Sequence, residues 1–179
     1  MASRREFFRS LARPLAPETV EATPLVVRPP YGLDESLFQS GCLACESKAC
    51  VASCEEKIIV LDEQGIPTLD FSVNGCTFCE ACAEVCEADV LSLERSEGRE
   101  WINAEVRIGV EGCMAHNGVI CFACKEPCME DAILFHGMFN PVIDMDRCNG
   151  CGFCLGRCPT HAITLTPLSW PEEAGTAAQ

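Results

Sequence analysis

The chain has 179 residues, 16 cysteines and a formal net charge of −14. Cysteine at this density is typical either of a secreted disulfide scaffold or of a metal-rich protein. A surface this acidic repels nucleic acid and attracts basic protein partners, although acidity also serves solubility alone. The sequence contains no apolar run of eighteen or more residues, so we predict no membrane span.

Residues 1–33 contain five prolines and no cysteine, a composition typical of an extended, flexible tether. Its tip, Ser3–Arg9, reads SRREFFR and resembles the twin-arginine export motif. The apolar core that export requires does not follow, because residues 11–17 read LARPLAP. We therefore expect a cytoplasmic protein whose basic tip docks a partner or an anionic surface, and not an exported one.

The cysteines fall into four groups of four. Groups two and four follow the C-x2-C-x2-C-x3-C run of bacterial ferredoxins. Group three has a longer first gap of seven residues, and group one has a middle gap of four residues where two is usual. In chain order the groups are Cys42, Cys45, Cys50 and Cys54; Cys76, Cys79, Cys82 and Cys86; Cys113, Cys121, Cys124 and Cys128; and Cys148, Cys151, Cys154 and Cys158.

Each group is followed by a short apolar run, and the runs after groups one and three continue into a similar pattern. IIVLDEQGIPTLDFSVNGC and AILFHGMFNPVIDMDRC both read as strand, turn and second strand, leading to the next cysteine. Such runs flanking a glycine-containing turn predict β-hairpins. Group one is therefore paired with group two, and group three with group four, with residues 95–99 (RSEGR) as the turn between the halves.

In the bacterial ferredoxin run, three cysteines hold one 4Fe–4S cube and the fourth reaches the neighbouring cube. We therefore predict four 4Fe–4S clusters that use all sixteen cysteines and chemistry limited to one-electron transfer. The predicted ligand sets are Cys42, Cys45, Cys50 and Cys86; Cys76, Cys79, Cys82 and Cys54; Cys113, Cys121, Cys124 and Cys158; and Cys148, Cys151, Cys154 and Cys128.

Zinc in all-cysteine sites is the alternative. Zinc sites usually join two C-x2-C pairs across a longer spacer, whereas these cysteines form blocks of four. Disulfides are disfavoured in a cytosolic chain. The sequence holds no nucleophile elbow, phosphate-binding glycine loop or dinucleotide fingerprint, so we expect an electron carrier or accessory protein and not an enzyme. His116, in the long loop of group three, is expected to face solvent, the alternative being that it tunes the adjacent cluster.

These observations predict an α+β fold of two tandem bacterial-type 2x(4Fe–4S) ferredoxin-like units. Each unit has too small an apolar core to be stable alone, so the clusters would supply the missing cross-links. The predicted boundaries are a flexible tip and tether over 1–33, unit one over 34–98, unit two over 99–168 and a disordered tail over 169–179.

The chain resembles the NapF family, the ferredoxin-type proteins of periplasmic nitrate reductase systems. The resemblance lies in the SRR start, Arg28-Pro29-Pro30-Tyr31, Asp34-Glu35-Ser36 with Phe38, the order and spacing of the four groups, and the closing CNGCGFCLGRCP. Two positions depart from the family pattern. Group one has its middle gap of four residues, 46–49, and Glu87 follows the last cysteine of group two where the family usually has proline.

The resemblance implies a cytoplasmic accessory protein that contacts the catalytic molybdenum subunit of the nitrate reductase before export. It would assist maturation of that subunit by delivering electrons or iron–sulfur equivalents. The alternative is an electron-transfer polyferredoxin subunit of a reductase complex, with another basic redox protein as its partner. A zinc-bearing scaffold without a redox role is a third possibility.

Overall fold

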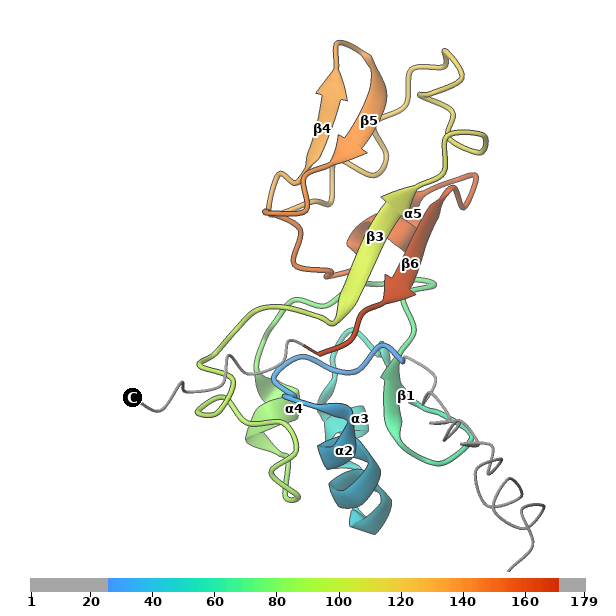
Figure 1. Cartoon of the computed structure of the whole chain (residues 1–179). Helices are drawn as coiled ribbons and strands as arrows, with labels where there is room; N and C mark the ends of the chain where they lie inside the picture. Colours follow the sequence, from blue (N-terminus) through green and yellow to red (C-terminus); the bar gives the residue numbers. More distant parts are fainter. Residues whose placement is uncertain (1–25, 171–179) are drawn as a thin grey trace, which may run out of the picture.

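The computed structural model describes residues 26–170. Its helices and strands are short, and loops that carry the cysteines connect them (Figure 1). No helix within these residues is long and apolar enough to cross a membrane. In chain order the elements are α2 (Glu35–Leu37), the π-helix η1 (Phe38–Cys42), α3 (Ala49–Ser53), β1 (Ile59–Leu61), β2 (Pro67–Leu69), α4 (Ala81–Glu84), β3 (Ala104–Ile108), β4 (Ile133–His136), β5 (Phe139–Ile143), α5 (Phe153–Arg157) and β6 (Ile163–Pro167).

The two predicted hairpins are confirmed. Strand β1 pairs antiparallel with β2, with Ile59 opposite Leu69, and β4 pairs antiparallel with β5, with Ile133 opposite Ile143. A third two-stranded sheet joins β3 to β6, which lie far apart in the sequence. Figure 1 shows this sheet in the middle of the molecule, with helices α2 to α4 toward one end and the β4–β5 hairpin toward the other.

Among the described residues of the first half, no strand pair corresponds to the β3–β6 sheet. The apolar run after group two, residues 90–93, forms no strand, although Val90 and Leu91 are buried. Instead, the Ser92 amide donates to the Tyr31 carbonyl oxygen at 3.0 Å, and the Leu69 amide donates to the Val27 carbonyl oxygen at 3.2 Å. The segment before group one therefore takes the place that a strand pair occupies in the second half.

Burial of this segment corrects the prediction of a flexible tether over residues 1–33. Arg28 is 1% exposed and Tyr31 2%, and Val27 belongs to the same core. The side chain of the buried Asn103 binds the segment to the start of β3, because its oxygen accepts from the Arg28 amide and its amide donates to the Val26 carbonyl. The predicted tip, with the rest of residues 1–25, lies outside the described part of the chain.

The predicted disordered tail, residues 169–179, begins too early, because Trp170 is packed against the rest of the protein. Trp170 stacks on Phe38 with ring centroids 5.9 Å apart and meets Trp101 edge-on at 6.1 Å. Both tryptophans are therefore packing residues, and the last described residue is held against the first half of the molecule. Residues 171–179 lie outside the described range.

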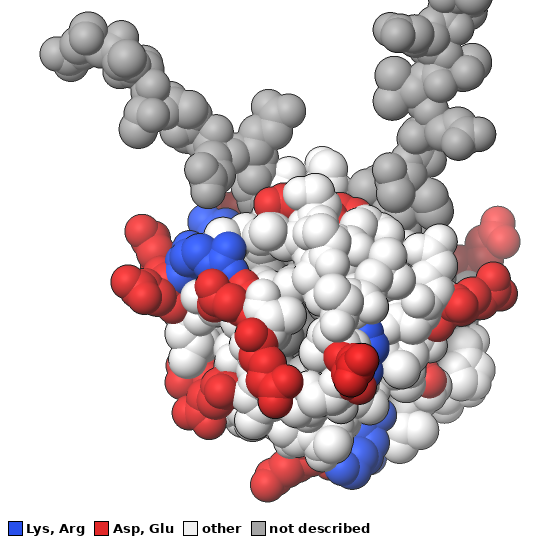
Figure 2. All heavy atoms as spheres, turned by 90° about the horizontal axis from the view of Figure 1, so that it is seen from below, with Lys and Arg blue, Asp and Glu red and all other residues white. Residues whose placement is uncertain are grey.

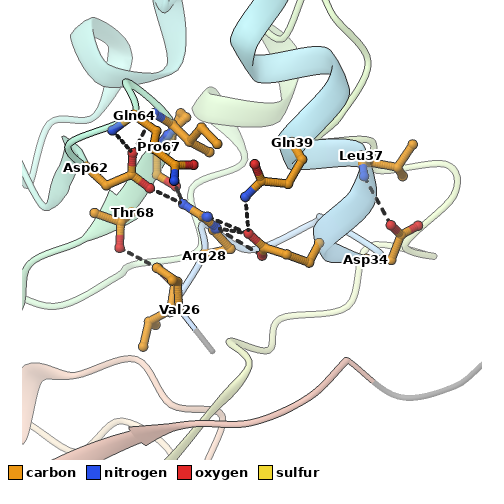
Figure 3. A network of polar contacts seen from close by, with 12 residues as sticks. Val26, Arg28, Asp34, Leu37, Gln39, Asp62, Gln64, Pro67 and Thr68 are labelled. Atoms are coloured by element: carbon orange, nitrogen blue, oxygen red, sulfur yellow. Dashed lines mark hydrogen bonds and ion pairs between the residues drawn. The ribbon is translucent and has the colours of Figure 1, made fainter. Parts of the chain in front are cut away.

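The Arg28 guanidinium is the centre of the polar network in Figure 3. It donates to both carboxylate oxygens of Glu35, to Asp62 at 3.0 Å and to the Pro67 carbonyl oxygen at 3.0 Å. Its carbon also lies 5.5 Å from the centre of the Phe38 ring. Burial lowers the pKa of Arg28, but hydrogen bonds to the two carboxylates raise it more, so the net pKa lies above its ordinary value. This arginine joins the leading segment to α2 and to the β1–β2 turn.

We expect Arg28→Ala to lower the free energy of unfolding by about 3 kcal/mol, because it leaves two carboxylates and a buried carbonyl without their cation. The value lies at the low end for buried pairs, since Glu35 and Asp62 are 24% and 25% exposed and retain some hydration. Urea denaturation of the anaerobically purified protein measures the change.

Arg95→Ala is the matched control, because Arg95 pairs with Asp89 at 3.2 Å on the surface. An exposed pair contributes less than about 1 kcal/mol. Equal losses in the two variants would contradict a structural role for the buried network.

Candidate iron–sulfur sites

The structure brings the sixteen cysteines together in four sets of four, and each set lines one hollow. We number the hollows by the predicted cluster that each would hold. Hollow one is lined by Cys42, Cys45, Cys50 and Cys86; hollow two by Cys54, Cys76, Cys79 and Cys82; hollow three by Cys113, Cys121, Cys124 and Cys158; and hollow four by Cys128, Cys148, Cys151 and Cys154. This grouping coincides with the predicted exchange of the fourth cysteine between paired groups.

A single turn of helix directs the exchange in groups one, two and four. The third cysteine lies inside the turn, as Cys50 does in α3, Cys82 in α4 and Cys154 in α5. The fourth cysteine follows at or just beyond the end of the turn, as Cys54 does for α3 and Cys158 for α5. The backbone is already extended at Cys54 and Cys158, so the chain leaves the helix there. The third cysteine therefore lines the hollow of its own group, and the fourth lines the neighbouring hollow.

The apolar run after a group supplies an amide to that group's last sulfur. Ala132 donates to Cys128 Sγ at 3.3 Å, and Ala162 donates to Cys158 Sγ at 3.2 Å. In the first half, Leu91 donates to Cys86 Sγ at 3.4 Å. Amide hydrogen bonds to ligand sulfur are among the factors that set cluster potentials. These runs therefore contribute to the sites as well as to packing.

Burial raises the pKa of eight of the sixteen thiols. Burial raises the pKa of Cys42 and Cys124 to about 11, and that of Cys76 and Cys82 to about 12, with neighbouring thiolates adding to the effect. Four thiolates in one hollow would repel one another, whereas a cationic centre between them favours the charged form. The hollows thus suit a group that brings positive charge with it.

The donor set of each hollow fits a 4Fe–4S cluster. Each hollow is lined by four cysteines and is partly open to solvent. Four cysteine thiolates are the usual ligands of such a cluster. Among residues 26–170, no three His, Cys, Asp or Glu side chains are placed so that they could hold one metal ion.

The four hollows follow one another in the order one, two, four, three. Hollows one and two share groups one and two, and hollows four and three share groups three and four. Between the pairs, the Cys76 amide donates to the Cys151 carbonyl oxygen at 2.7 Å, which joins a cysteine of hollow two to one of hollow four. Glycine permits this approach, because a Cβ on Gly152 would lie 2.2 Å from the Phe71 ring and one on Gly75 2.5 Å from Phe153. Hollows one and three are therefore the outer members of the series.

The two departures from the family pattern meet at hollow one. Ser47, in the long middle gap of group one, donates to a Glu87 carboxylate oxygen at 3.1 Å, and its hydroxyl lies 3.6 Å from Cys45 Sγ. This hydrogen bond with Ser47 lowers the pKa of Cys45. Lys48 adopts a left-handed conformation with φ 44° and donates its ammonium to the Cys42 carbonyl oxygen. The longer gap is thus accommodated as an ordered bulge on the rim of the hollow.

Asn117 holds the long first gap of group three in place. Its side-chain amide donates to the carbonyl oxygens of Val110, Glu111 and Cys113 at 3.0, 3.2 and 2.8 Å. The expectation that His116 faces solvent is wrong. The residue is half-buried, and its Nε2 is hydrogen-bonded to the Pro141 carbonyl oxygen at 3.0 Å. The sequence reasoning missed Asn117, although asparagine in a long loop is a common partner of local backbone carbonyls.

Comparisons with known proteins agree with this geometry. The ferredoxin-type protein NapF of Escherichia coli K12 is 37% identical over 146 residues, which cover 79% of this chain and 85% of that protein. The NapF of Haemophilus influenzae is 31% identical and covers 82% of each chain. This chain belongs to the NapF family of ferredoxin-type proteins. The ferredoxin-type protein NapG of Escherichia coli K12 is more distant, at 28% identity over 93% of this chain and 86% of its own.

Two family matches identify the cofactor class. Residues 41–90 match the 4Fe-4S dicluster domain, and residues 141–164 match the 4Fe-4S binding domain. The dicluster match includes groups one and two, and the second match includes group four. This NapF-family chain is therefore an iron–sulfur protein of the electron-transfer type, with 4Fe–4S clusters as its cofactors.

The exchange of ligands predicts which site is lost when one cysteine is replaced. Cys158→Ser should damage the cluster bound by Cys113, Cys121 and Cys124, because these residues share hollow three with it. The cluster in hollow four should survive, although Cys158 belongs to the same sequence group as Cys148, Cys151 and Cys154. Electron paramagnetic resonance of the reduced protein, with Cys128→Ser as the reciprocal control, measures the loss. Damage confined to hollow four in the Cys158 variant would contradict the observed grouping.

Proposed function

We propose that this NapF-family protein carries four 4Fe–4S clusters, one in each hollow, in two tandem ferredoxin-like units. The observation that carries the proposal is the convergence of sixteen cysteines on four hollows of similar size, with none left over. The β1–β2 and β4–β5 hairpins occupy equivalent places after groups one and three, which supports the tandem arrangement.

A bound 4Fe–4S cluster supplies reversible one-electron oxidation and reduction. The residues of the chain hold it by four thiolates, donate amide hydrogen bonds to the ligand sulfurs and limit access of water. Aromatic side chains form part of this shield: Phe38 lines hollow one, and Tyr31, whose hydroxyl donates to the Phe78 carbonyl oxygen at 2.9 Å, lines hollow two. These roles are those of an electron carrier or accessory protein and not of an enzyme.

We propose further that the client is the catalytic molybdenum subunit of periplasmic nitrate reductase. The protein would assist its maturation in the cytoplasm by delivering electrons or iron–sulfur equivalents. Membership of the NapF family supports this proposal, as does the net charge of −14, which favours a basic surface on the client.

A dedicated electron-transfer subunit of a reductase complex is the second candidate. The similarity to NapG and to the methylamine utilization ferredoxin-type protein MauM of Methylophilus methylotrophus favours it. MauM is 27% identical over 98% of this chain, so related ferredoxin-type proteins belong to more than one system. Dependence of a reductase's steady-state turnover on this protein would favour the second candidate over maturation.

Cluster content and client activation test the proposal together. Anaerobically purified protein should contain about sixteen iron and sixteen sulfide per chain, four of each per cube, with absorption near ~400 nm that bleaches on reduction. Cells that lack the protein should accumulate nitrate reductase catalytic subunit with low activity, and the purified protein should restore that activity. Stoichiometric zinc without sulfide would falsify the cluster assignment, and full activity in its absence would refute the maturation role.

Cytoplasmic location is a separate expectation. A reporter that is active only after twin-arginine export, fused behind residues 1–40, should remain silent because the paired arginines lack an apolar core. The same reporter behind a functional twin-arginine signal is the control. Reporter activity in the periplasm would overturn the cytoplasmic assignment.

A further inference from the structure

The negative charge of the chain is concentrated in its first half. Residues 34–98 contain fourteen Asp and Glu against three Lys and Arg, whereas residues 99–168 contain eight against five. Figure 2 views the end formed by the first half and shows acidic side chains distributed over this face, with few basic groups. The two ends of the molecule, which hold the outer hollows one and three, therefore differ in charge.

Hollow one is lined by residues of this acidic half. Its Cys42 and Cys50 are buried, whereas Cys45 and Cys86 are half-buried and lie toward the surface. The residue that follows each of these two in the sequence is an exposed glutamate, Glu46 after Cys45 and Glu87 after Cys86. The more accessible ligands of the hollow are thus flanked by negative charge.

Two exposed apolar side chains accompany the glutamates. Leu43, next to Cys42, is 57% exposed, and Val85, next to Cys86, is 36% exposed and lines the hollow. Glu84 is exposed beside Val85. We call Leu43, Glu46, Glu84, Val85 and Glu87 the acidic mouth of hollow one.

The acidic mouth is ordered by contacts within the protein. The hydrogen bond from Ser47 to Glu87 joins the loop after Cys45 to the loop after Cys86. Lys48, the basic residue of the first loop, donates a hydrogen bond from its ammonium to the Cys42 carbonyl oxygen, so the acidic mouth has three glutamates against this one lysine. A preformed surface loses less entropy when it binds a partner.

Hollow three presents a different surface. The loop that carries its first cysteines exposes one glutamate, Glu111, and three large apolar residues: Val110 is 60% exposed, Val119 46% and Ile120 60%. A cationic partner would therefore be steered to hollow one and not to hollow three, because long-range attraction follows the charge.

We propose that the acidic mouth of hollow one is the docking surface for a protein with a ring of lysine and arginine around an apolar centre. The glutamates face the ring, and Leu43 with Val85 pack on the centre, which brings the partner against the wall of the hollow. The proposal rests on the proposed function, since it gives the clusters a place of contact with a client. It specifies which of the two outer hollows that client meets.

Cytochrome c is a suitable probe, because it is a lysine-rich protein with an apolar edge around its haem. The test variant is Glu46→Gln with Glu84→Gln and Glu87→Gln. The control variant is Glu111→Gln with Glu126→Gln and Asp146→Asn, which removes the same charge from exposed positions of the second half. Both variants must retain the iron and sulfide content of the unchanged protein.

At low ionic strength the test variant should bind oxidised cytochrome c about tenfold more weakly than the unchanged protein, and the control less than about twofold. The difference should disappear as salt shortens the screening length below about 8 Å. Carbodiimide, which couples carboxylates directly to lysine amines, should link the probe through Glu46, Glu84 or Glu87. Equal weakening in both variants, or coupling mainly within residues 99–168, would overturn the docking surface.

The same variants separate this proposal from the proposed client. Purified nitrate reductase catalytic subunit should show the same order of binding, with the test variant weakest. If cytochrome c follows the expected order and the subunit binds none of the three proteins, the docking surface stands and the proposed client is wrong. If the subunit binds all three equally, the client stands and the docking surface is wrong.

Discussion

The exchange of one cysteine between paired groups is the constraint on which the rest of the structure depends. No hollow is complete within its own sequence group, because each takes its fourth sulfur from the partner group. The hairpins and single helical turns between the groups must therefore position the cysteine loops of two groups relative to each other. Within residues 26–170 there are three two-stranded sheets and helices of five residues or fewer, so this part of the chain has little regular structure to do this alone. Cluster binding then contributes directly to folding free energy.

The segment before group one completes the first half, in whose described residues no strand pair is equivalent to the β3–β6 sheet. The buried Arg28 donates hydrogen bonds to two carboxylates and to the Pro67 carbonyl oxygen, and Tyr31 lines hollow two. The residues that carry the family resemblance are thus explained by structure: Glu35 and Phe38 contact Arg28, and Asp34 caps α2 by accepting from the Leu37 amide. A conspicuous motif near one end of a chain need not be a partner-binding element.

The two ends of the molecule differ in charge, and each contains one of the outer hollows, one or three. The close backbone contact between Cys76 and Cys151 places hollows two and four in the interior of the series, which leaves one and three as the outer members. The long middle gap of group one and Glu87 lie together on the rim of hollow one, joined through Ser47. The departures from the family pattern therefore shape one end of the molecule and leave the ligand arrangement intact.

The sequence by itself predicted the cofactor class, the grouping of the cysteines around four hollows and both hairpins, because cysteine spacing and strand–turn–strand patterns are local signals with a known geometric meaning. It did not determine whether residues 26–31 are buried, since proline-rich composition is shared by exposed tethers and by buried extended segments. Only the tertiary structure placed Asn103 and Arg28 in the core, because their partners lie between 7 and 77 residues away. The order of the hollows and the meeting of Ser47 with Glu87 were likewise decided by packing between distant segments, for which no short-range pattern exists.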